Sequence, residues 1–119
     1  MTGTSRSAKQ TMADILNAIA RSRVADKRLR LAKSLGDDVG MQIAFQAVML
    51  NLSVIGESVS ALPVEILERE PGTPWSEFVA MRDVTGHDYY RIVPEEVHRT
   101  VEEDLGALEA AVQRISNAR

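Results

Sequence analysis

The fold is decided by residues 41–62, which read MQIAFQAVMLNLSVIGESVSAL. Large apolar residues recur here at alternating intervals of four and three, the period of a helix that buries one face. This first stripe consists of Met41, Phe45, Val48, Leu52, Ile55, Val59 and Leu62. A second stripe lies on the nearly opposite face and consists of Ile43, Ala47, Leu50, Val54 and Ala61. Because a helix that is apolar on two faces needs two neighbours, we expect it either to be central to a bundle or to be shared between its own core and a partner subunit.

The segment before it predicts another amphipathic helix. From about Thr11 to Val24, the helical period is kept by Met12, Ile15, Leu16 and Ile19. The basic stretch that follows can continue this helix or form a short second one, with Leu29 and Leu31 as its few apolar anchors. Gly36 predicts the end of that helix, and Asp37 or Asp38 suits the N-cap of the next.

The segment after it begins with a break and returns to helix. Three prolines and a glycine interrupt the pattern at Pro63, Pro71, Gly72 and Pro74. Thr73 and Pro74 then suit the N-cap and first position of a short helix that carries Trp75, Phe78, Val79 and Met81. Pro94 opens the last helix, with acidic residues in its first turn. Its expected buried stripe is Val97, Val101, Leu105, Leu108, Val112 and Ile115.

These elements predict an all-α, antiparallel bundle of four to five helices in a single domain, because no stretch alternates as a strand does. We expect residues 1–10 to be a flexible N-terminus and residues 11–119 to be the helical domain. The composition, 45% hydrophobic and 26% charged with no cysteine, excludes a disulfide framework and a thiolate zinc site. No apolar run approaches the ~20 residues of a membrane span, and the first residues lack the apolar core of a signal peptide. We therefore expect a cytoplasmic protein without a membrane segment.

The net charge of −3 conceals an asymmetry along the chain. Through Leu35 there are eight Lys or Arg against two Asp, and the rest of the chain carries six Arg against fifteen acids. The basic part permits a local surface for phosphate groups, although a solvated helix face is the simpler explanation of such a charge run.

The residues best suited to chemistry lie in residues 82–89, which read RDVTGHDY. Histidine titrates near neutrality and can act as acid or base, and arginine offers a fork of donors to phosphate. A purely structural interpretation is an ion-paired helix end, in which Arg82 bridges Asp83, Asp88 or Glu57 and His87 is exposed. The other histidine, His98, has polar neighbours that predict a plain surface position.

The pattern Arg82-x-x-x-x-His87-x-Tyr89 resembles the signature of HepT-like proteins within the wider HEPN group. Two further features are similar to that family. Residues 52–57 read LSVIGE in the long helix, and the pair Pro74-Trp75 leads into the Arg-Asp pair. The resemblance covers roughly Met12 to Ile115.

What the resemblance implies is a metal-independent ribonuclease toxin that is active as a homodimer. Arg82 and His87 from both chains would line a cleft at the two-fold interface, with RNA as the substrate. In toxin–antitoxin systems of this type the partner is a minimal nucleotidyltransferase, MntA, which transfers AMP from ATP to the motif tyrosine, here Tyr89. The chain itself would need no cofactor, because ATP and Mg²⁺ would belong to the antitoxin.

The chemistry of RNA cleavage agrees with these roles. The 2′-hydroxyl must lose a proton, the leaving 5′-oxygen must gain one, and the phosphate must be stabilised. One histidine per subunit cannot easily do the first two in one turnover, so a dimer that joins two sites would supply the second. On an ideal helix Tyr89 lies about 20° from Arg82, but His87 lies about 140° away, so Gly86 would have to supply a bend.

Two acidic residues are expected to support the site. Asp83, beside the arginine, and Glu57, on the central helix, can orient Arg82 or His87, or they can merely satisfy buried donors.

Two other functions stay open. One is a non-catalytic HEPN module that binds a nucleotidyltransferase partner and nucleotide or RNA, and the other is a purely structural dimerisation bundle. Metal catalysis is disfavoured, because the two histidines lack ligand spacing and there is no cysteine.

Overall fold

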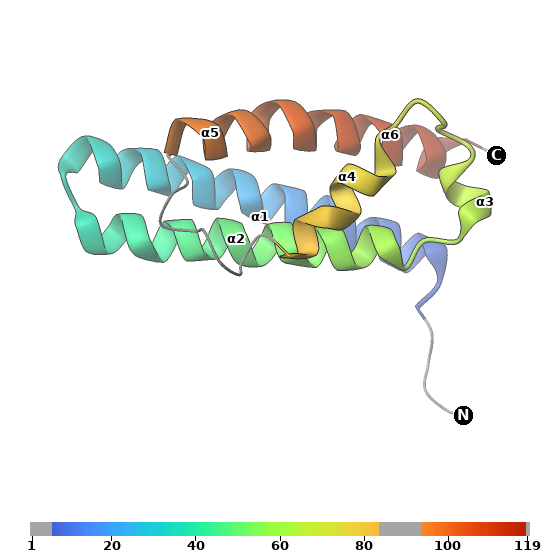
Figure 1. Cartoon of the computed structure of the whole chain (residues 1–119), viewed down its shortest axis with the longest axis horizontal. Coiled ribbons are helices and arrows are strands. Elements are labelled where there is room, and N and C mark those ends of the chain that lie inside the picture. The colour runs from blue at the N-terminus through green and yellow to red at the C-terminus, as the bar shows by residue number, and fades with distance from the viewer. Residues whose placement is uncertain (1–5, 84–93, 119) are drawn as a thin grey trace.

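The computed structural model describes residues 6–83 and 94–118 of the chain. Its frame is a long antiparallel hairpin of α1, Ala8–Leu35, and α2, Asp38–Ser60 (Figure 1). The described residues form helices and turns without a strand, which confirms the all-α prediction. α1 begins at Ala8, earlier than Thr11, because Ser7 and Gln10 form a capping box. It then continues unbroken through the basic stretch.

The turn between α1 and α2 is formed by the residues that the sequence marks for it. Gly36 adopts φ 67°, a left-handed conformation that glycine takes without a Cβ clash. The N–H of Asp37 donates to the carbonyl of Ala32 at 2.9 Å, which closes the end of α1. The Asp37 carboxylate then accepts from the N–H of Gly40 at 2.9 Å and caps α2, so both predictions are confirmed.

The remaining elements cover this hairpin. Two short helices, α3 (Val64–Leu67) and α4 (Trp75–Val79), lead into the 3₁₀ turn η1 (Ala80–Asp83). The Trp75 indole donates to the carbonyls of Leu67 and Glu70, both at 3.1 Å, and so fixes the connection between α3 and α4. The N-cap of α4 is Pro74 rather than Thr73, so the predicted boundary is wrong by one residue.

The C-terminal part forms one continuous rod along α1. It consists of α5 (Pro94–Arg99), the π-helical turn η3 (Thr100–Asp104) and α6 (Leu105–Asn117), and Figure 1 shows it on the side of α1 opposite to α2. All six residues of its predicted stripe are buried, at 3% exposure or less. α1 therefore contacts α2 on one side and the C-terminal rod on another, and it is α1 that occupies the middle of the bundle.

The two apolar stripes of α2 differ in exposure: the first is largely buried, and the second is largely exposed. In the first, Val48, Leu52, Ile55, Val59 and Leu62 are buried, and Met41 and Phe45 pack against the core from partly buried positions. In the second, Ile43 and Leu50 are 64% and 63% exposed, and Val54 is 36% exposed. The two-sided pattern thus reflects one buried face and one apolar face that is open in the single chain. On α1, Leu31 is also exposed, at 58%, so the prediction that it anchors the helix is wrong, whereas Leu29 is buried.

α2 also has the length and composition of a membrane span. It has 23 residues, and a window within it has a mean hydropathy of 1.5 with 33% of its residues buried. The expectation that no apolar run reaches this length is therefore wrong for α2. Core helices of soluble proteins have the same properties, and α2 packs along α1, so this feature is weak support for a membrane.

A bidentate ion pair joins the middle helix to α6 of the rod. The Arg23 guanidinium donates to both Glu109 carboxylate oxygens, at 2.8 and 2.9 Å. These bonds hold the pKa of Glu109 below its ordinary value, although partial burial acts in the opposite direction.

Candidate functional site

The backbone of Arg82 lies directly against α2. A Cβ atom built on Gly56 would lie 2.3 Å from the Arg82 nitrogen and 2.9 Å from its Cα, closer than packed atoms approach. The Ser53 hydroxyl, one turn earlier on α2, donates to the Arg82 carbonyl at 3.2 Å. Ser53 and Gly56 therefore form a seat for η1, and glycine is needed at position 56 because the two backbones touch there.

The side chains near this seat are open to solvent. Arg82 and Asp83 are both exposed at the end of η1, and Glu57 is exposed on α2. Within the described ranges, no hydrogen bond or ion pair joins Arg82 to Asp83 or to Glu57. The predicted ion pairs of Arg82 with Asp83 and with Glu57 are therefore absent from the described part of the chain. Because Asp83 and Glu57 are exposed, the idea that they satisfy buried donors is also wrong.

The rest of the predicted motif lies outside the described residues. His87 and Tyr89 fall in the range 84–93, as do Gly86 and Asp88. Their convergence with Arg82, and the bend at Gly86, stay predictions. Glu57 lines a shallow hollow with Arg6, Thr11 and Asp14. The supporting role expected for Glu57 also stays a prediction.

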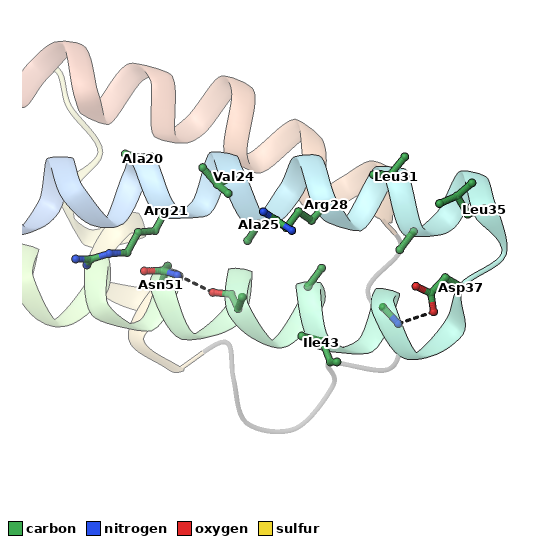
Figure 2. A pocket seen from close by; sticks show the side chains of 14 residues that line it. Ala20, Arg21, Val24, Ala25, Arg28, Leu31, Leu35, Asp37, Ile43 and Asn51 are labelled. Atoms are coloured by element: carbon green, nitrogen blue, oxygen red, sulfur yellow. Dashed lines mark hydrogen bonds between the residues drawn. The ribbon is translucent and has the colours of Figure 1, made fainter.

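A broad apolar groove runs between α1 and α2 (Figure 2). It has a volume of about 650 Å³, and its most exposed apolar members are Val24, Leu31, Leu35 and Ile43. The α2 stripe continues from there through Leu50 to Val54. On an ideal helix Leu50 lies only about 60° from Ser53, the residue bonded to Arg82. The exposed apolar face therefore borders the seat of η1.

Of the eight basic side chains through Leu35, four form ion pairs within the described residues. Arg23, Arg30 and Lys33 form ion pairs with Glu109, Asp26 and Glu95, and Arg6 pairs with Asp14. Arg21 and Arg28 line the apolar groove, are exposed and have no ion pair within the described part of the chain (Figure 2). About half of the basic charge is thus neutralised locally, and free guanidinium groups remain beside the open face.

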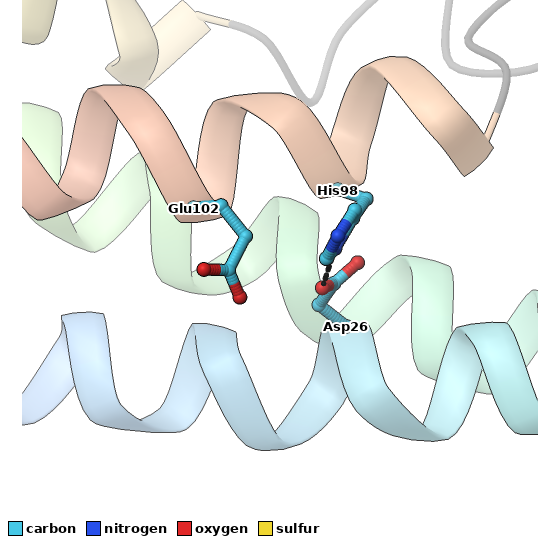
Figure 3. A group of neighbouring side chains, drawn as sticks. All are labelled: Asp26, His98 and Glu102. Carbon is cyan, nitrogen blue, oxygen red and sulfur yellow. Dashed lines mark hydrogen bonds and ion pairs between the residues drawn. The ribbon is translucent and has the colours of Figure 1, made fainter.

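A buried histidine–aspartate contact is the polar feature that sequence analysis missed. Asp26 is only 1% exposed, and its Oδ2 lies 2.7 Å from Nδ1 of His98 (Figure 3). His98 is thus half-buried against α1, and the prediction of a plain surface histidine is wrong. The sequence held a signal for the burial of Asp26, because Ile15, Ile19, Ser22, Asp26 and Leu29 follow each other at the spacing of one helix face. All five are buried in the structure.

Comparison with known proteins places this chain in a family. The family model described as "Ribonuclease HepT-like" matches residues 27–115, which include η1 and its seat on α2. "Putative RNase TTE0752" of Caldanaerobacter subterraneus subsp. tengcongensis is 32% identical over 82 residues, which cover 69% of this chain and 73% of that protein. "Probable ribonuclease HepT" of Thermococcus cleftensis is 30% identical over 69 residues, which cover 58% of this chain and 63% of that protein. No solved structure gives a significant match. The chain therefore belongs to the HepT-like ribonuclease family.

Proposed function

We propose that this protein is a metal-independent endoribonuclease and the toxin of a toxin–antitoxin pair. The observation that carries the proposal is the position of Arg82. Its backbone is fixed against Gly56 and Ser53 while its guanidinium group is exposed, in a chain whose family is that of HepT-like ribonucleases. A positioned, solvent-facing arginine suits the binding of a phosphate from a strand that approaches from outside.

The proposed reaction is attack of the ribose 2′-oxygen on the adjacent phosphorus. His87 removes the proton of the 2′-hydroxyl, and the bond to the 5′-oxygen breaks as the 2′,3′-cyclic phosphate forms. An imidazolium from the second subunit donates a proton to the leaving 5′-oxygen. Arg82 stabilises the charge that builds up on the phosphate oxygens.

The exposed apolar face supports a homodimer as the active species. This face consists of Val24, Leu31 and Leu35 on α1 and of Ile43 and Leu50 on α2. A contiguous apolar patch on the surface of a single chain is typical of a protein–protein interface. A two-fold pairing through this face would bring the two copies of Arg82 to the edges of one interface, since the seat of η1 borders the face. The same pairing would bury the second apolar stripe of α2.

Control by an antitoxin is the second part of the proposal. A minimal nucleotidyltransferase of the MntA type, using its own ATP and Mg²⁺, would transfer AMP to the hydroxyl of Tyr89 with release of pyrophosphate. The modification adds bulk and a negative charge in the sequence neighbourhood of Arg82, which disfavours entry of RNA.

The test compares three variants of the purified protein on RNA in the presence of EDTA. Arg82→Ala and His87→Ala are expected to lose at least about a hundredfold in cleavage rate, within the range that one catalytic donor or proton-transfer group supplies. Arg69→Ala is the matched control, because Arg69 is exposed and lies on the connection between α3 and α4. Circular dichroism must show that all three are folded.

Two results would contradict the proposal. Undiminished cleavage by folded His87→Ala protein would remove the histidine from the reaction. Absence of cleavage by the unmodified wild type, together with firm binding of a nucleotidyltransferase, would favour the non-catalytic HEPN module instead.

A further inference from the structure

Asp26 is an incompletely satisfied buried carboxylate. Its side chain is 1% exposed, and its Oδ2 accepts from His98 and lies 3.4 Å from Nε of Arg30. Oδ1 has no hydrogen-bond partner within the described residues. A buried carboxylate oxygen without a partner costs free energy, and a bound ion is one of the ordinary ways in which that cost is offset.

Two further ligand-type side chains face Asp26 from the C-terminal rod. His98 and Glu102 lie four residues apart, one turn from each other, and Asp26 comes from the opposite helix (Figure 3). One ligand atom from each residue lies within 4.8 Å of the others. The π turn η3 begins between them at Thr100, and such turns often occur at functional sites.

We infer that Asp26, His98 and Glu102 bind a divalent transition metal ion of the zinc type between α1 and the C-terminal rod. One imidazole nitrogen and two carboxylates are the borderline-to-hard donors that zinc accepts, and three protein ligands leave one position for water. The mixed donor set disfavours Mg²⁺ and Ca²⁺, which take oxygen ligands.

Coordination requires a modest rearrangement of the present contacts. The hydrogen bond between His98 Nδ1 and Asp26 Oδ2 is replaced by bonds to the ion from Nδ1 and from both carboxylate oxygens of Asp26, so that Oδ1 gains a partner, with the imidazole proton on Nε2. Nδ1 and Oδ2 must separate from 2.7 Å to the roughly 3.3 Å that tetrahedral zinc requires. His98 can supply this movement, because its side chain is 36% exposed.

The charged residues around Asp26, His98 and Glu102 allow the hydrogen bond between His98 and Asp26 to be replaced by bonds to the ion. Arg30 is 47% exposed and can turn into solvent, and Arg23 stays engaged with Glu109. The two carboxylates of the group then neutralise the ion. The group lies on α1, α5 and η3, whereas Arg82 lies on η1, so the ion would stabilise the bundle and take no part in the proposed RNA cleavage.

The experiment titrates ZnCl₂ into EDTA-treated, dialysed full-length protein by isothermal calorimetry and records Tm with and without zinc. Wild type is expected to bind one ion per chain and to gain several degrees in Tm at saturating zinc. His98→Gln and Glu102→Gln are expected to weaken binding by about tenfold or more and to lose the gain in Tm. Glu103→Gln, the exposed neighbour of Glu102, is the matched control and should behave as wild type.

The inference is overturned if wild type binds no zinc. It is equally overturned if His98→Gln and Glu102→Gln bind zinc as tightly as Glu103→Gln, because the ion would then lie elsewhere. If His98→Gln unfolds, Glu102→Gln decides the question alone, since Glu102 is exposed and forms no hydrogen bond or ion pair with the described residues.

Discussion

Gly56 on α2 and Arg82 on η1 touch through their backbones, so the residue that anchors the proposed catalytic arginine has no side chain. Gly56→Ala would place a methyl group 2.3 Å from the Arg82 nitrogen. Because backbone rather than a flexible side chain must move, we expect η1 to shift from its seat. RNA cleavage should fall by at least about tenfold, and urea unfolding should show a loss of about 1–3 kcal/mol, typical of overpacking.

The control for this change is Gly106→Ala in α6. Apart from its own helix backbone and chain neighbours, no atom of the described residues lies within 4 Å of a Cβ at Gly106, so alanine should raise helix stability by up to about 1 kcal/mol and leave cleavage unchanged. Equal cleavage by Gly56→Ala and Gly106→Ala would contradict the importance of the seat.

Leu50→Glu tests the apolar face of α1 and α2. Leu50 is 63% exposed in the single chain, so a charge there should leave the folded monomer intact but oppose burial against a second copy. We expect sedimentation equilibrium to show a shift from dimer to monomer, with cleavage falling in parallel. Val64→Glu, which is 60% exposed on α3, should remain dimeric. A Leu50→Glu protein that still forms a dimer would place the interface elsewhere.

Glu109→Gln tests the contribution of the Arg23 pair to acid stability. The hydrogen bonds from Arg23 lower the pKa of Glu109 in the folded protein, so this contribution is present above the ordinary pKa of 4.5 and is lost as pH falls through the folded value. Both side chains are about one-third exposed, so the effect should not exceed about 1 kcal/mol. Tm measured from pH 7 to pH 3 should fall less steeply for Glu109→Gln than for Glu103→Gln. Identical slopes would show that the pair adds nothing to the pH dependence.

Tyr89→Phe tests the proposed modification. Co-expression with a minimal nucleotidyltransferase should raise the intact mass of the wild type by the mass of one or more AMP groups and abolish cleavage. Tyr89→Phe should keep the unmodified mass, because phenylalanine lacks the accepting hydroxyl. Tyr90→Phe is the neighbouring control and should be modified like wild type, and modification of Tyr89→Phe at Tyr90 would reassign the acceptor.

The helices could be predicted because their signals are local. The cap residues Gly36 and Asp37 and the regular stripes on α2 and the C-terminal rod depend on neighbours within a turn or two. The helical spacing of apolar residues alone could not tell which of the two apolar faces of α2 is buried by the rest of the chain. That depends on where the C-terminal rod docks, and the rod lies on α1.

The polar contacts were harder to predict because they join distant segments. Asp26 and His98 are separated by 72 positions, and nothing local to either residue indicates the other. The seat of Arg82 on Gly56 is a contact between distant residues too, although residues 52–57 could be recognised by their resemblance to a family. The sequence thus predicts a role for Arg82 but gives no reason why a glycine is needed against its backbone.

The π turn η3 adjusts the rotational phase of the C-terminal rod. Val97, Val101 and Leu105 follow each other at two successive intervals of four, which on an ideal α-helix would rotate the third residue about 80° away from the first. The i to i+5 bond from the Leu105 N–H to the Thr100 carbonyl widens one turn and cancels this drift. The widened turn keeps α5 and α6 facing the same neighbour by accommodating one extra residue. Removing one residue from it would therefore leave a regular α-helix in which the two ends of the stripe, then seven positions apart, lie within about 20° of each other and both halves still face α1.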